Sequence, residues 1–109
     1  VGGSAPALLD RCATLGDGWI PLRGANEKAQ ACIDRIKTGR EAIGKSMDGF
    51  GIQAQAQYAG GTPERWVKHA KAWQGMGCTH LAIATHNAGE TDVDGHLARI
   101  AEYQQALAD

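Results

Sequence analysis

Three residues near the start of the chain, Gly2, Gly3 and Ser4, are of the types that bind phosphate. They precede a predicted helix that carries Leu8 and Leu9 at helical spacing. The first N–H groups of a helix have no partner within the helix and lie at the positive end of its dipole. Glycine lets an anion approach the backbone closely. The pattern predicts a phosphate-binding turn; the alternative is a plain strand-to-helix turn with Ser4 as the helix cap.

A second candidate segment contains Gly18, Trp19 and Ile20. It is a short apolar run between turn residues, which predicts a buried strand over 18–22, with Pro21 near its end. At the carboxyl end of such a strand, Trp19 and Ile20 either contact a ligand or fill the core. The residue types leave both interpretations open.

Among the four histidines, His86 is the one placed for chemistry. Together with Thr85, it follows a predicted strand over 79–84, and active sites gather at the carboxyl ends of parallel strands. An imidazole there suits acid–base work or phosphate binding. His69 is expected on a solvated helix face, His80 at a strand start in a structural role, and His96 on an exposed helix surface. No histidine pair has the spacing of a metal site.

Three glutamines alternate with apolar residues over 50–58. Gln53, Gln55 and Gln57 share one side of the predicted strand, and the other side carries Phe50, Ile52, Ala54, Ala56 and Tyr58. Such a polar side fits the lumen of a barrel near an active-site mouth, with Gln55 as a candidate substrate contact. It equally fits an edge strand with one solvated face.

These residues are positioned by alternating helices and strands. Helices are expected over 4–15, over 26–43 with Asn26 as its cap and a break near Gly39, from Pro63 with Thr62 as its cap, and over 92–108. Strands are expected over 18–22, 50–58 and 79–84. The alternation predicts one α/β domain over 1–109 with a mainly parallel sheet. Either an open doubly wound sheet or part of a (βα) barrel satisfies it.

Composition narrows the function classes. The 109 residues carry a net charge of −1 with no basic stripe, which argues against a nucleic-acid or polybasic membrane partner. No apolar run approaches the ~20 residues of a membrane span. The first residues lack the features of a signal peptide. Three cysteines at unpatterned spacing are expected to be small buried residues in a reducing cytoplasm. No catalytic triad, Walker loop or full dinucleotide fingerprint is present.

Four short sequence passages, spread over nearly the whole chain, carry a family resemblance through their order and spacing. They are Val1-Gly2-Gly3-Ser4, Leu15-Gly16-Asp17-Gly18-Trp19-Ile20-Pro21, Gly61-Thr62-Pro63-Glu64 followed by Met76-Gly77-Cys78-Thr79-His80-Leu81, and Ala84-Thr85-His86-Asn87-Ala88-Gly89. Together they resemble the luciferase-like monooxygenase superfamily of flavin- and deazaflavin-dependent oxidoreductases. No single passage is specific; the specificity lies in their order and spacing.

The resemblance implies a fold, a coenzyme and a site. The fold would be the C-terminal half of a (βα)8 TIM barrel, with four parallel strands, Val1 ending the first of them, and four helices. The coenzyme would be a deazaflavin (F-420) or FMN. Gly2, Gly3 and Ser4 would hold its phosphate, and the implied coenzyme contacts also include Gly18, Trp19 and Ile20.

The resemblance also implies hydride transfer or monooxygenation of a small organic substrate, with Gln55, Thr85 and His86 as substrate candidates and no catalytic residue identified. The chain alone would be inactive, because the first four βα units would be missing. Its partner would be those units or a second copy. The alternative function is a non-catalytic half-barrel that self-associates as an assembly unit. A third account is an independent flavodoxin-like binding module.

Overall fold

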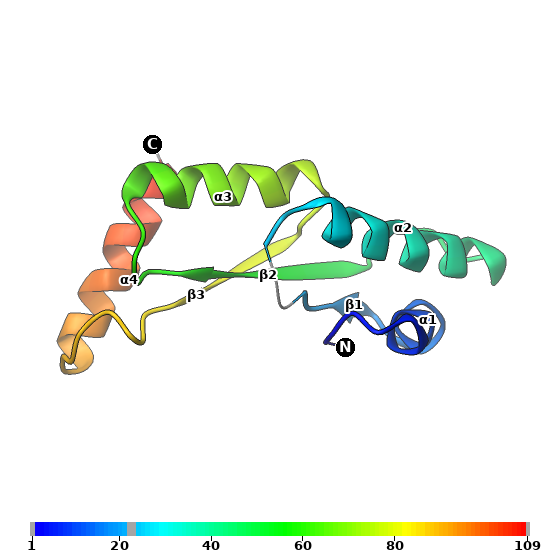
Figure 1. The fold of residues 1–109 in the computed structure, drawn as a ribbon, viewed down its shortest axis with the longest axis horizontal. Coiled ribbons are helices and arrows are strands. Elements are labelled where there is room, and N and C mark those ends of the chain that lie inside the picture. The colour runs from blue at the N-terminus through cyan, green and yellow to red at the C-terminus, as the bar shows by residue number, and fades with distance from the viewer. Residues whose placement is uncertain (1, 22–23, 109) are drawn as a thin grey trace.

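The computed structural model describes residues 2–21 and 24–108, in which helices and strands alternate (Figure 1). The order is α1 (Pro6–Leu15), β1 (Gly18–Trp19), α2 (Glu27–Ala42), β2 (Gly51–Gln57), α3 (Pro63–Gly75), β3 (His80–Ala84) and α4 (Val93–Ala108). The predicted α/β alternation is confirmed, with four helices and a parallel sheet.

The sheet has three strands in the order β1-β2-β3, and both pairings are parallel. Gly2 adds an isolated parallel bridge to Ile20, on the far side of β1 from β2. The end of a strand at Val1 was expected before α1; Val1 lies outside the described residues, and within them the Gly2 bridge is what is found there. The expected strand over 18–22 pairs with β2 through Gly18 and Trp19, and Leu22 lies outside the described residues.

Strand β2 has the two-sided character that its alternation predicts. Phe50, Ile52, Ala54 and Ala56 are each at most 4% exposed. On the opposite side Gln53 is half-buried, and Gln55 and Gln57 are exposed. The helices therefore cover one face of the sheet at β2 and leave the glutamine face open.

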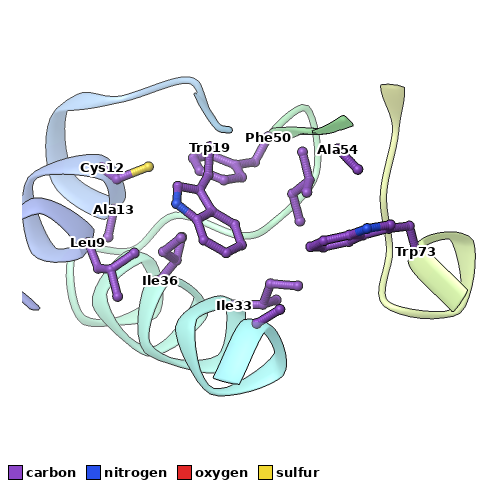
Figure 2. Close-up of a cluster of buried hydrophobic side chains, with 11 residues drawn as sticks. Leu9, Cys12, Ala13, Trp19, Ile33, Ile36, Phe50, Ala54 and Trp73 are labelled. Atoms are coloured by element: carbon purple, nitrogen blue, oxygen red, sulfur yellow. The ribbon is translucent and has the colours of Figure 1, made fainter. Parts of the chain in front are cut away.

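The main core lies between α1, α2 and the β1–β2 half of the sheet (Figure 2). Its largest fully buried side chains are Trp19, Trp73, Ile36 and Cys12. Burial raises the pKa of the Cys12 thiol, as expected for an unreactive core residue. Cys32 and Cys78 are half-buried, and no cysteine forms a disulfide. A smaller cluster of Ala56, Trp66 and Tyr103 joins α3 and α4 to the other half of the sheet.

The helix caps were predicted correctly at two of three sites. The Asn26 side chain accepts a hydrogen bond from the Ala29 backbone amide, and the Thr62 hydroxyl accepts one from the Arg65 backbone amide. For α1 the prediction was wrong, because the residue in the cap position is Ala5 and not Ser4.

The break expected in α2 near Gly39 does not occur, since the helix continues to Ala42. Gly39 faces α1, and a Cβ built on it would lie 2.8 Å from the Cβ of Ala13. The glycine is therefore explained by the close approach of the two helices. Glycine is about 1 kcal/mol less favourable than alanine inside a helix, and here the close packing of α1 against α2, which leaves no room for a side chain, offsets that cost. Among the described helices, none is both long and apolar enough to cross a membrane.

Candidate functional site at the carboxyl end of the sheet

The turn formed by Gly2, Gly3 and Ser4 runs from the Gly2–Ile20 bridge to the start of α1. Gly3 has a φ of 99°, in the left-handed region that favours glycine. The cap residue Ala5 makes no side-chain hydrogen bond to α1, and Ser4 is exposed with no hydrogen bond from its hydroxyl in the described chain. Pro6 has no N–H, and the Leu8 and Leu9 amides donate to the Ala5 carbonyl oxygen, so in the described chain Ala7 is the residue of the first turn whose amide is left open to an anion.

Trp19 fixes this turn from inside the core. Its indole N–H donates to the carbonyl oxygen of Gly3 over 2.7 Å, while the ring is only 2% exposed. The hydrogen bond joins residues 16 positions apart, so no local pattern in the sequence could have revealed it. Of the two interpretations of Trp19, burial in the core is the one observed, and the residue positions the turn.

A cavity of about 310 Å³ opens beside the turn. Its wall brings Ser4, Trp19 and Pro21 together with residues of the cap and first turns of α2, which are Asn26, Lys28, Ala29 and Cys32. Lys28 is the cation in this wall, and it was not singled out from the sequence. A serine hydroxyl, a lysine and an uncapped helix end near one cavity suit a phosphate or a carboxylate.

The structure does not bring the remaining candidates into this cavity. Gly18 and Ile20 line a hollow of about 330 Å³ that also contains Gln53 and His80. Gln55 lines a separate hollow of about 360 Å³ with Arg65 and His69, where α3 begins. The predicted residues therefore occupy several neighbouring hollows.

Thr85 and His86 follow β3, as predicted, and a third residue joins them. The Nδ1 of His96 on α4 lies 2.9 Å from the hydroxyl oxygen of Thr85. His86 and His96 line one open hollow of about 580 Å³. The expectation that His96 lies on an exposed helix surface was wrong, because the residue is half-buried against this loop.

Arg99 holds the loop after β3 in place. Its guanidinium donates to the carbonyl oxygens of Thr85, Ala88 and Gly89 at 3.0–3.1 Å. Asn87, at the tip, has a φ of 59°. The three hydrogen bonds explain how the loop keeps this less favourable backbone conformation.

A tyrosine–glutamate pair next to this loop makes stability depend on alkaline pH. The Tyr58 hydroxyl donates to Glu102 over 2.6 Å, and this bond raises the pKa of Tyr58. Folding thus favours the neutral phenol. The contribution is complete below the unfolded-state pKa of about 10 and is lost as pH rises through the higher folded-state value. In denaturant titrations, stability should fall less above pH ~10 in Tyr58→Phe than in the wild type. Equal slopes for the two proteins would contradict the prediction.

Within the described residues, no group of three or more histidine, cysteine or acidic side chains is placed to hold a metal ion. This edge of the sheet presents the left-handed Gly3 turn at one end and the side chains of Thr85, His86 and His96 at the other. No protein-family model matches the chain, and no curated protein is similar enough to it to count as a relative.

Proposed function

We propose that the chain is the C-terminal half of a luciferase-like (βα)8 barrel and that it binds the phosphate of a flavin or deazaflavin coenzyme on the Gly2-Gly3-Ser4 turn. One observation carries the proposal. The left-handed Gly3 is tied to Trp19 through its carbonyl, while the N-terminus of α1 beyond it has no side-chain cap. A turn held in one conformation beside the open Ala7 amide supports the binding of an anion there.

The surrounding residues fit a phosphate. The Ser4 hydroxyl can donate a hydrogen bond, and Lys28 in the cavity wall supplies a compensating positive charge. A Cβ on Gly3 would lie 3.2 Å from Leu8 and would force the turn out of its left-handed conformation. These residues would contact the phosphate group of a coenzyme. The residues that would face its flavin or deazaflavin ring are not among them.

Bound coenzyme would supply hydride transfer or oxygen activation, and the protein would supply position and electrostatics. The residues of this chain would hold the phosphate at one end of the carboxyl edge. At the other end, Thr85, His86 and His96 would contact a small organic substrate and exchange protons with it. Expressed by themselves, residues 1–109 are expected to bind coenzyme without turning over substrate, because a (βα)8 barrel needs four further βα units.

The strand order favours the barrel over a doubly wound sheet. A flavodoxin-like sheet reverses its strand order at a switch point, where its ligand binds. Here Gly2, β1, β2 and β3 follow one another in chain order across the sheet. The open glutamine face of β2 also agrees with a surface that would face a barrel lumen.

The test is calorimetric titration of the chain with FMN and, as a matched ligand without phosphate, riboflavin. We expect FMN to bind at least tenfold more tightly, and Ser4→Ala to weaken FMN by roughly tenfold through loss of one charge-assisted hydrogen bond. Gly3→Val should abolish the preference for FMN. Gly44→Val is the control, because Gly44 is also left-handed, with a φ of 77° and no atom near an added Cβ. Equal affinity for FMN and riboflavin would disprove the proposal.

A further inference from the structure

Helix α4 exposes a row of large apolar side chains, of which Leu107 borders a hollow that α3 and β3 also line. Val93 is 74% exposed, Leu97 57%, Ile100 40% and Leu107 37%. They recur at intervals of four, three and seven residues, the spacing of a seam between two helices. Tyr103, which attaches α4 to the core, adjoins the row between Ile100 and Leu107. We name these four residues the α4 stripe.

The stripe has few charges around it. Gln104 fills the gap between Ile100 and Leu107, and Ala101 and Ala108 flank the row. A glutamine amide both donates and accepts hydrogen bonds, so Gln104 can form a hydrogen bond with a polar group of a second copy. Asp94 borders the Val93–Leu97 end, and it is around Ile100 and Leu107 that the surface is able to pack against a second copy without bringing like charges together.

Strand β3, which precedes α4, is an open edge of the sheet. It pairs with β2 on one side and, in the described chain, with nothing on the other. The edge offers five residues, His80–Ala84, with backbone groups available for pairing. The opposite edge is much weaker, because β1 has two residues and Gly2 contributes a single bridge beyond it.

The chain also exposes more surface than a monomer of its size. Its accessible surface is 6974 Å² for 11.5 kDa, against about 5,800 Å² for a compact monomer of that mass. Its radius of gyration is 15.6 Å, against about 13 Å, and it is visibly elongated (Figure 1). The excess, roughly 1,200 Å², exceeds the ~800 Å² that each partner buries in a standard interface.

We infer that the α4 stripe and the outer edge of β3 form a two-fold interface with a second copy of this chain. The two β3 strands pair antiparallel, and the two α4 helices pack antiparallel beside them. Centred on Ile100, this packing sets Ile100 against its own mate and Val93 against Leu107 of the other copy. The second copy covers the β3 edge, which in a complete barrel would pair with a parallel strand.

Light scattering over a concentration series tests the interface with the full chain. We expect a dimer of twice 11.5 kDa for the wild type. Leu97→Glu and Ile100→Glu should each weaken dimerisation at least 100-fold and leave the helical circular dichroism unchanged. The matched control is Leu15→Glu, which alters an even more exposed leucine, 81% exposed on α1, and should remain a dimer. A wild-type monomer at all concentrations would overturn the inference, and so would a dimer that both α4 variants retain.

A crosslinking measurement keeps the inference testable if a glutamate variant misfolds. With Cys32→Ser and Cys78→Ser as background, Ile100→Cys should form a disulfide-linked dimer under mild oxidation, because Ile100 meets its own mate. Leu15→Cys in the same background should run as a monomer on a non-reducing SDS gel. Equal crosslinking of the two variants would contradict the two-fold packing. Coenzyme binding does not enter either measurement, so a failed FMN titration leaves this inference standing.

Discussion

Trp19→Ala should lower the free energy of unfolding by about 3–5 kcal/mol, the range for deleting a buried tryptophan ring. The indole is 2% exposed and packs in the main core with α1, α2 and β2 (Figure 2). Its removal leaves a cavity beside Ile36 and takes away the hydrogen bond that holds Gly3. Urea titration followed by circular dichroism measures the loss. A change below about 1 kcal/mol would mean that the site collapses around the alanine and that the core does not depend on this ring.

A pair of phenylalanine substitutions separates the hydrogen bond from the packing. Trp19 and Trp73 are both fully buried in the same core, but the Trp73 indole N–H has no hydrogen-bond partner in the described chain. Each Trp→Phe change removes similar ring volume, and only Trp19→Phe also leaves the Gly3 carbonyl without its donor. We expect Trp19→Phe to be the more destabilising by about 1–1.5 kcal/mol. Equal losses would show that the bond to Gly3 contributes nothing to stability.

The same pair connects stability to the proposed site. If Trp19 positions the turn, Trp19→Phe should weaken FMN binding at the Gly3 turn while Trp73→Phe leaves it unchanged. The comparison is made on folded protein, so the outcome reports the geometry of the turn and not the fraction unfolded. Trp19 would then be a positioning residue for the phosphate.

Local patterns in the sequence were sufficient for the order and type of the elements. Alternation over 50–58 predicted which side of β2 is buried, because side chains in a strand point alternately to its two faces. The caps Asn26 and Thr62 were predictable because capping is a contact between residues three positions apart. Ser4 was misassigned because Ala5, which cannot cap with its side chain, occupies the cap position.

The contacts that build the candidate site were not predictable in this way. Trp19 reaches Gly3 across 16 residues, and Thr85 meets His96 across 11, from a different element. Both contacts depend on how the elements pack, which a local residue pattern does not encode. The same reason explains Gly39. Its low helix propensity predicted a break in α2, but its role is to let α1 approach closely, which depends on packing.

Gly39→Leu is the second substitution expected to have a large effect, with a loss of about 1–3 kcal/mol from overpacking. An added Cβ would lie 2.8 Å from the Ala13 Cβ, which is short of normal contact and cannot rotate away. Ala13 is 1% exposed, so α1 and α2 must move apart and open the core around Leu9 and Ile36. Thermal and urea unfolding measure the effect. Gly75→Leu is the matched control, because Gly75 is also helical with nothing near an added Cβ, and it should be neutral or stabilising.

A double-mutant cycle shows whether the Ala13 contact is the cause. Gly39→Ala gains about 1 kcal/mol of helix propensity but meets the Ala13 methyl. Ala13→Gly removes that methyl and loses a similar amount. If the methyl contact decides the outcome, the unfolding free energy of the double variant is higher than the sum of the two single changes predicts. The difference, the coupling energy, should be about 0.5–3 kcal/mol. Additive changes would place the cost of Gly39→Leu elsewhere, in strain within α2 itself. A positive coupling would instead establish that the α1–α2 approach requires one small residue at this crossing, on either helix.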